Sequence, residues 1–184
     1  MKFIELANLR QSVRRYTDKL VEPEKIDNCI EAARIAPSAS NAQPWKYIVI
    51  DNPEIKNKIA DVTFDKLMSF NKFVPQAPVI IVLIAERPNF KSQIGGWLKN
   101  KEFNLIDIGI SAEHFCLQAA EEGLGTCMLG WYNERKVKQI LEIPKNKRPV
   151  LLISLGYAEK EYKQRTKIRK SKENIVCYNK YSFK

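Results

Sequence analysis

Two uninterrupted apolar runs constrain the fold of this chain most strongly. Val79–Ala85 reads Val-Ile-Ile-Val-Leu-Ile-Ala, and Pro149–Gly156 reads Pro-Val-Leu-Leu-Ile-Ser-Leu-Gly. Runs of this length, rich in β-branched residues, are typical of strands that are covered on both faces. Each is far shorter than the ~20 apolar residues that cross a bilayer, so we expect no membrane partner.

Helical periodicity is clearest in two other stretches. Apolar residues recur at spacings of three and four from Pro23 to Ala36 and from Asn104 to Gly123. Pro23 suits a first helical turn, and Gly123 is placed to cap the end of the second helix. The remaining helices are predicted at Phe3–Leu9, from Pro53 through Ile59 and Leu67, and from Asn133 to Leu141. A strand is predicted at Trp45–Ile50, and a short strand followed by a turn at Thr126–Trp131.

The basic charge raises the question of a nucleic-acid partner. The chain has 31 Lys and Arg against 21 Asp and Glu, a net charge of +10, and Lys163–Lys172 holds six basic residues and no acidic one. Either this tail is solvated or it binds phosphate. Because there is no helix-turn-helix signature and no basic stretch interleaved with aromatic residues, we expect no nucleic-acid partner.

The cysteines and the single histidine limit which kinds of disulfide and metal site the chain can form. The four cysteines form no Cys-x-x-Cys pair, so buried reduced thiols are expected rather than disulfides or a zinc site. His114 is the only histidine, which excludes a histidine-rich metal centre. Gly-x-Gly-x-x-Gly and Walker loops are missing, which argues against a Rossmann or P-loop nucleotide site. The start lacks the features of a signal peptide, so we expect a cytoplasmic protein.

The connection Ala36–Trp45 carries a dense set of hydrogen-bonding groups. Pro37 and Pro44 stiffen its two ends, and Ser38, Asn41 and Gln43 lie between them. Such a loop is either a surface shaped for a flat polar ligand or a turn that closes a helix. Trp45 is assigned to the core.

Arg10, Ser12 and Arg14 alternate along a segment that follows the first helix. In an extended backbone these three side chains point the same way, with the cations ~7 Å apart. Two guanidiniums and a hydroxyl can hold a phosphate between them. The alternative is a solvated basic turn.

Three separated motifs together resemble the FMN-dependent nitroreductase family. They are Arg10–Arg14 (Arg-Gln-Ser-Val-Arg), the loop Ala36–Trp45, and Gly123–Trp131 (Gly-Leu-Gly-Thr-Cys-Met-Leu-Gly-Trp), in that family's order. The resemblance implies one domain over residues 1–184 and an α+β fold, an α/β sandwich in which helices flank a mostly antiparallel sheet. It also implies an intertwined homodimer with the helix Asn104–Gly123 at its centre.

The resemblance further implies how FMN is bound. Arg10 and Ser12 are placed at the phosphate, together with Lys167 and Arg169 of the basic tail. Arg14 is expected at the N1 and O2 side of the flavin, where a cation stabilises the reduced ring. The full set of implied cofactor-binding residues is Arg10, Gln11, Ser12, Arg14, Pro37, Ser38, Ala39, Asn41, Asn71, Leu129, Gly130, Lys167 and Arg169.

Several of these assignments concern the flavin ring. Leu129 and Gly130 are expected to direct a backbone N–H at the flavin N5, and Gly130 has no side chain to block the approach. Asn71 is assigned to the pyrimidine edge, although the spacing after it departs from the family pattern. The loop residues Pro37, Ser38, Ala39 and Asn41 are expected to contact the flavin bound mainly by the other subunit.

The function implied is an FMN-dependent NAD(P)H oxidoreductase. Hydride would pass from NADH or NADPH to N5 and then to a nitroaromatic, quinone or related conjugated acceptor, with ping-pong kinetics and no catalytic side chain. Glu86–Lys101 has no clear period and is interpreted as the segment that selects the acceptor. The alternatives are an FMN enzyme that catalyses dehalogenation, ring fragmentation or dehydrogenation, or a basic nucleic-acid-binding protein.

Overall fold

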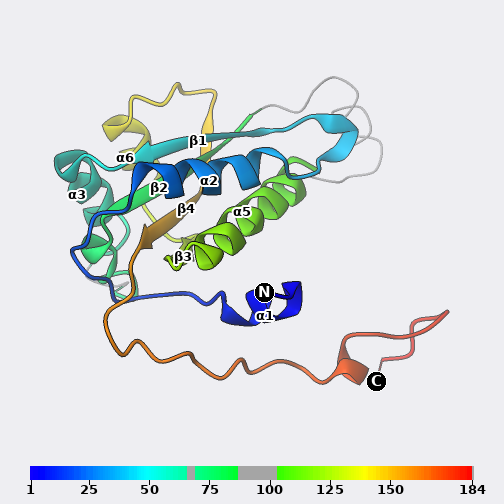
Figure 1. Ribbon diagram of the computed structural model, residues 1–184. Coiled ribbons are helices and arrows are strands. Elements are labelled where there is room, and N and C mark those ends of the chain that lie inside the picture. Colours follow the sequence, from blue (N-terminus) through cyan, green and yellow to red (C-terminus); the bar gives the residue numbers. More distant parts are fainter. Residues whose placement is uncertain (66–68, 87–102, 184) are drawn as a thin grey trace.

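A four-stranded antiparallel sheet forms the centre of the computed structural model, which describes residues 1–65, 69–86 and 103–183. The strands are β1 (Trp45–Ile50), β2 (Val79–Ala85), β3 (Gly125–Leu129) and β4 (Arg148–Gly156). Their order is β1-β2-β4-β3, so the two apolar runs are the central strands (Figure 1). Every neighbouring pair is antiparallel, as predicted.

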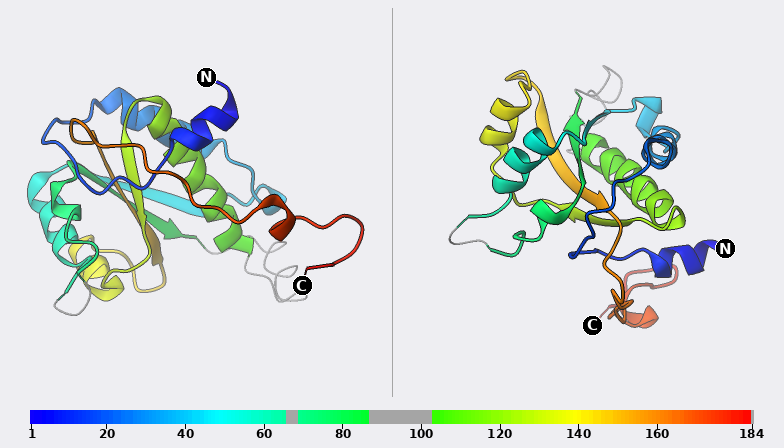
Figure 2. Two further views of the ribbon diagram at one scale, coloured as in Figure 1. Left: turned by 90° about the horizontal axis from the view of Figure 1, so that it is seen from below. Right: turned by 60° about the vertical axis from the view of Figure 1, so that its left-hand side comes forward.

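Helices cover both faces of the sheet. They are α1 (Phe3–Leu9), α2 (Pro23–Arg34), α3 (Pro53–Asp61), α5 (Phe103–Glu121) and α6 (Glu134–Ile140), with short 3-10 turns η1 (Ala39–Asn41), η2 (Val74–Gln76) and η3 (Lys172–Asn174). The pair α2 and α5 packs on one face, and α3 and α6 pack on the other (Figure 2). The predicted α+β sandwich is therefore confirmed.

The alternation of side chains along β2 explains why the run is apolar throughout. Ile81 and Leu83 join the core beneath α2 and α5. Ile80 and Val82 join the core beneath α3 and α6. Successive side chains of a strand point to opposite faces, so a strand between two helical layers needs an apolar residue at every position.

The helix ends follow local signals. Pro23 occupies the first turn of α2, and Gly123 after α5 has the left-handed φ of 75° that a capping glycine adopts. The side chain of Asn133 accepts a hydrogen bond from the Lys136 N–H at 3.0 Å and caps α6. These three boundaries are predicted correctly.

The predicted continuation of the third helix through Leu67 is wrong, because α3 ends at Asp61. Thr63 stops it. Its N–H bonds to the Ala60 oxygen three residues back, and its hydroxyl donates to the same oxygen at 2.7 Å. Its own carbonyl accepts from Asn71 Nδ2. The end of α3 is therefore stabilised partly by Asn71, a residue outside the helix.

Segments near the two termini lie side by side. Ser12 forms a parallel bridge with Thr126 of β3, and Tyr16 forms an antiparallel bridge with Ala158, just beyond β4. The chain after Ala158 then runs past residues 8–14 with little regular structure (Figure 2). Among the described helices, none is long and apolar enough to cross a membrane. The segment predicted to select the acceptor lies outside the described residues from residue 87 onward.

Candidate functional site

A cavity of about 340 Å³ lies between the segment after α1 and the basic tail. It forms because residues 10–14 run extended along the start of β3, where Val13 N–H donates to Thr126 O at 2.8 Å. The tail then crosses the outside of this segment. The cavity is lined by Arg10, Gln11, Ser12, Arg14, Arg165, Thr166, Lys167, Ile168 and Arg169. The structure therefore brings together six of the predicted cofactor-binding residues, Arg10, Gln11, Ser12, Arg14, Lys167 and Arg169.

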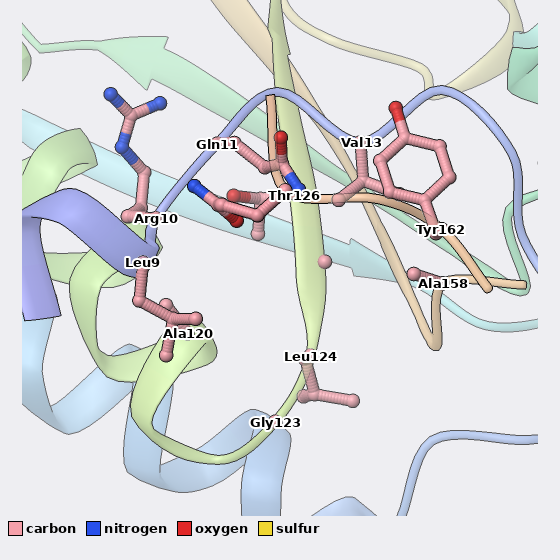
Figure 3. Close-up of a pocket in the computed structure, with 12 residues that line it drawn as sticks. Leu9, Arg10, Gln11, Val13, Ala120, Gly123, Leu124, Thr126, Ala158 and Tyr162 are labelled. Carbon is pink, nitrogen blue, oxygen red and sulfur yellow. The ribbon is translucent and has the colours of Figure 1, made fainter. Parts of the chain in front are cut away.

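Figure 3 shows how the N-terminal segment crosses β3 at Thr126. A smaller hollow of about 200 Å³ lies on its inner side, next to Leu9, Ala120 and Leu124. Arg10 points away from these apolar side chains (Figure 3). The apolar residues anchor the segment, and its cations face the other cavity.

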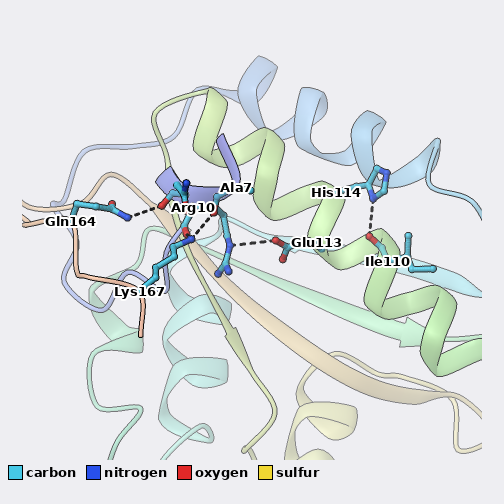
Figure 4. Close-up of polar contacts among 8 residues, drawn as sticks. Ala7, Arg10, Ile110, Glu113, His114, Gln164 and Lys167 are labelled. Atoms are coloured by element: carbon cyan, nitrogen blue, oxygen red, sulfur yellow. Dashed lines mark hydrogen bonds and ion pairs between the residues drawn. The ribbon is translucent and has the colours of Figure 1, made fainter. Parts of the chain in front are cut away.

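Hydrogen bonds to backbone carbonyls fasten the tail to the N-terminal segment (Figure 4). Gln164 Nε2 donates to Asn8 O at 2.8 Å, and Lys167 Nζ donates to Ala7 O and to Arg10 O, the latter at 2.6 Å. The ammonium group thus lies at the carbonyl end of α1, where a cation is favourable. Burial and the neighbouring Arg10 lower the pKa of Lys167.

Arg165 is a cavity residue that the sequence analysis did not assign. Its guanidinium donates to Ser12 O, and its backbone N–H donates to Gln11 Oε1 at 3.1 Å. The signal was present in the sequence, because Arg165, Lys167 and Arg169 alternate in the same way as Arg10, Ser12 and Arg14.

Two guanidiniums in the cavity remain available for a ligand. Within residues 1–65, 69–86 and 103–183, no hydrogen bond is made by the terminal nitrogens of Arg10 or by the side chain of Arg14. The remaining guanidinium nitrogen of Arg10, Nε, lies 3.4 Å from Glu113 Oε1. Arg169 donates only to the adjacent Ile168 O among the described groups. Guanidiniums bind phosphate oxygens through paired N–H groups, so this donor set fits a dianionic phosphate.

Gly130 lines a third cavity, also of about 200 Å³, at the opposite end of β3. A Cβ built at Gly130 would meet no described atom within 4 Å, whereas Leu129 is buried in the core. Four residues of extended chain separate Thr126 from Gly130, roughly 13 Å. A ligand with an anion at one end and a ring at the other could therefore lie along β3.

Asn71 belongs to the same end of the sheet as Gly130. It is buried, and its Nδ2 donates to Thr63 O and to Trp131 O, both at 3.0 Å. It therefore holds the turn that follows Gly130. Contact between Asn71 and a pyrimidine edge stays a prediction.

The loop after α2 is fixed by its own polar groups. Gln43 donates its N–H to Ser38 Oγ at 3.0 Å and its Nε2 to Asn41 Oδ1 at 2.9 Å. Ala39 N–H donates to the buried carboxylate of Asp107 on α5, with both oxygens at 3.2 Å. Asp107 was not singled out in the sequence, although a carboxylate inside an apolar helical pattern was a visible signal.

Within one chain, this loop and the phosphate cavity are far apart. In Figure 1 the loop with η1 lies beyond the right-hand end of α2, whereas the segment that follows α1 runs toward the lower left of the molecule. Of the thirteen predicted residues, six line the phosphate cavity, Asn71, Leu129 and Gly130 lie toward the other end of β3, and Pro37, Ser38, Ala39 and Asn41 lie on this separate loop.

No described side chain is arranged as a nucleophile or metal ligand. Cys29, Cys116 and Cys127 are buried as predicted, and burial raises the pKa of Cys29 and of Cys116 to about 12, so these thiols stay protonated. Cys177 is only partly buried. His114 Nδ1 contacts Ile110 O in its own helix. No group of metal-ligating residues is found in the described part of the chain.

Comparison with known proteins gives a consistent result. The sequence model of the Nitroreductase family matches residues 8–71 and 66–157. A protein of Archaeoglobus fulgidus that carries the name NADH dehydrogenase/NAD(P)H nitroreductase is 30% identical over 162 residues, and the match covers 86% of each chain. The FMN reductase (NAD(P)H) of Bacillus subtilis is 30% identical over 80% of this chain and 62% of its own. The structure of a nitroreductase family protein from Clostridium novyi superimposes with a TM-score of 0.76, 34% identity and 86% coverage of both chains.

Proposed function

The chain belongs to the nitroreductase family, and we propose that it is an FMN-dependent NAD(P)H oxidoreductase that reduces nitroaromatic, quinone or related conjugated acceptors. One observation carries the proposal: cations from both ends of the chain converge on one cavity at the start of β3, and Gly130, which is unobstructed, lies just beyond the other end of β3. FMN has an anionic phosphate and a redox-active ring, and this arrangement offers a place for each.

The residues present fit the cofactor. Arg10 and Arg14 have free guanidinium nitrogens among the described groups, and Ser12 adds a hydroxyl beside them. Arg165 and Lys167 hold the carbonyls of the same segment, which keeps its backbone in place when the phosphate binds. Arg10, Ser12 and Arg169 would therefore hold the phosphate, and Arg14 would extend from the same segment toward the ring.

At the flavin ring, protein groups would orient the cofactor and would not themselves take part in the reaction. The bound cofactor would supply hydride acceptance and hydride donation at its N5. Gly130 would direct its N–H toward that atom, and Arg14 would stabilise negative charge on the pyrimidine side. Donor and acceptor would occupy the same exposed face in turn, which gives ping-pong kinetics.

A homodimer would complete the site. α1 has no buried residue, and Phe3, Ile4 and Ile106 are 71%, 65% and 56% exposed. Phe3 of α1 and Ile106 of α5 border an apolar groove of about 700 Å³. Exposed apolar surface of this kind marks an interface. A second copy docked there would cover this surface and bring its Pro37–Asn41 loop to the flavin.

Anaerobic stopped-flow measurements test the proposed reaction. NADH or NADPH should bleach the visible absorption of the FMN-loaded protein, and a nitroaromatic or a quinone should then restore it. Parallel double-reciprocal plots in the steady state would support the ping-pong order. If neither nicotinamide bleaches the flavin, the proposed function is wrong, and if only a halogenated phenol restores the absorption, the enzyme is a dehalogenase.

A further inference from the structure

Arg10, which lines the phosphate cavity, is paired with a carboxylate outside that cavity, and the proposed function does not use this carboxylate. Glu113 of α5 lies with its Oε1 3.4 Å from Arg10 Nε, and the two side chains are 42% and 23% exposed (Figure 4). Arg10 Nε itself is buried and has no hydrogen-bond partner in the described part of the chain, so Glu113 is its counter-charge.

A carboxylate beside an anion site opposes binding by simple electrostatics. Glu113 would repel a phosphate held by Arg10, and it partly neutralises the positive charge of the cavity. A surface ion pair of this exposure adds little stability. Neither effect explains why α5 presents Glu113 to this particular arginine.

The geometry of a guanidinium suggests a reason. Its five N–H donors lie in one plane, so fixing the Nε edge fixes the direction of the two terminal nitrogens. Lys167 holds the Arg10 backbone oxygen at 2.6 Å, and Glu113 holds the side chain from the α5 side. Arg10 is thereby fixed at both ends before a ligand arrives.

We propose that Glu113 is a positioning residue of the phosphate site: it holds the Nε edge of Arg10 so that the terminal nitrogens face the phosphate. This inference rests on the proposed function. A pre-oriented arginine loses less conformational freedom on binding, and this gain exceeds the repulsion between carboxylate and phosphate.

The two effects of Glu113 have opposite signs, which makes the proposal testable. If Glu113 acts only by its charge, its removal strengthens phosphate binding. If it positions Arg10, its removal weakens phosphate binding. Comparing FMN with riboflavin isolates the phosphate, because the two ligands share the ring and any change at the ring or the dimer interface affects both.

The experiment measures dissociation constants of FMN and riboflavin by flavin fluorescence for wild type, Glu113→Ala, Glu113→Gln and Glu121→Gln. We expect Glu113→Ala to lower the preference for FMN by about tenfold, because Arg10 then loses the ion pair that orients its Nε edge. Glu113→Gln keeps an oxygen near Nε and should lose part of the preference. Glu121, an exposed residue at the end of α5 without a described side-chain partner, is the matched control for charge and should keep the wild-type preference.

The outcomes separate this inference from the proposed function. An unchanged or increased preference for FMN in Glu113→Ala overturns the role of Glu113, and should that variant fail to fold, the same result in Glu113→Gln decides. A wild-type protein that binds neither flavin overturns the proposed function and the inference with it. The mass of each variant in solution checks that all are compared in the same oligomeric state.

Discussion

Two glycines of the β3 region lack side chains for different reasons. A Cβ at Gly125 would lie 2.6 to 2.9 Å from the side-chain atoms of Val13, so the fold itself requires glycine there. A Cβ at Gly130 would meet no described atom within 4 Å, and its φ is not in the left-handed region. The fold does not require glycine at position 130, and we propose that its small size serves the approach of the flavin ring.

Gly130→Ala should therefore affect the flavin and spare the fold. Alanine removes backbone freedom from the unfolded chain, so the free energy of unfolding should stay the same or rise by up to about 1 kcal/mol. The added methyl group would obstruct the ring at N5, and we expect FMN binding or flavin reduction to weaken about tenfold. Urea unfolding and stopped-flow reduction measure the two effects.

Gly125→Ala is the matched control, with the opposite outcome. Its methyl group collides with Val13, and overpacking of this kind costs about 1–3 kcal/mol of stability. A Gly130→Ala protein that loses stability while reducing FMN normally would contradict the assignment of Gly130 to the ring.

At the level of elements, α5 organises one half of the sandwich through a few polar groups. Ser111 is fully buried, donates to Ala33 O of α2 at 2.8 Å, and lies 2.7 Å from the hydroxyl of Tyr47 on β1. Burial raises the pKa of Tyr47 to about 12, so this phenol stays neutral at physiological pH. One serine therefore joins a helix, a neighbouring helix and a strand.

Ser111→Ala should lower the free energy of unfolding by about 1–3 kcal/mol, because the Tyr47 hydroxyl and the Ala33 carbonyl lose a buried partner. Tyr47→Phe removes the other hydroxyl of the pair. In a double-mutant cycle by urea unfolding the two changes should be non-additive by at least about 0.5 kcal/mol. Strict additivity would show that the pair does not couple α5 to β1.

Sequence reasoning succeeded where a pattern is local and repeated. The period of α5, the apolar strands β2 and β4, and the caps at Pro23, Gly123 and Asn133 are all local signals, and all are confirmed. The end of α3 was missed because Thr63 is held by Asn71, across a turn that no local pattern encodes. Asp107 did stand out locally as a carboxylate inside an apolar pattern, but its partner Ala39 belongs to a distant loop that the pattern does not identify.

The candidate site shows the same limit. The alternation of Arg10, Ser12 and Arg14 indicated a phosphate site, and in the structure this segment and the basic tail line the same cavity. The backbone bonds of Lys167 and the pairing of Glu113 with Arg10 required coordinates, because they join residues far apart in the sequence.

On the scale of the whole molecule, one chain leaves apolar surface exposed on α1 and α5. Ile106→Glu places a charge in the groove where a second copy would dock, and because Ile106 is 56% exposed the isolated chain should tolerate it. We expect the protein to become monomeric and to lose FMN. Leu20→Glu, at a residue 77% exposed outside this groove, should leave the dimer intact. Light scattering after size-exclusion chromatography distinguishes the two, and a dimeric Ile106→Glu protein would place the interface elsewhere.

The most direct test of the account combines flavin content with molecular mass for the purified wild-type protein. We predict a yellow dimer that releases one FMN per chain on denaturation, because cations from both termini hold the phosphate and the ring lies where two copies meet. A colourless monomer that does not bind added FMN would contradict the central claim.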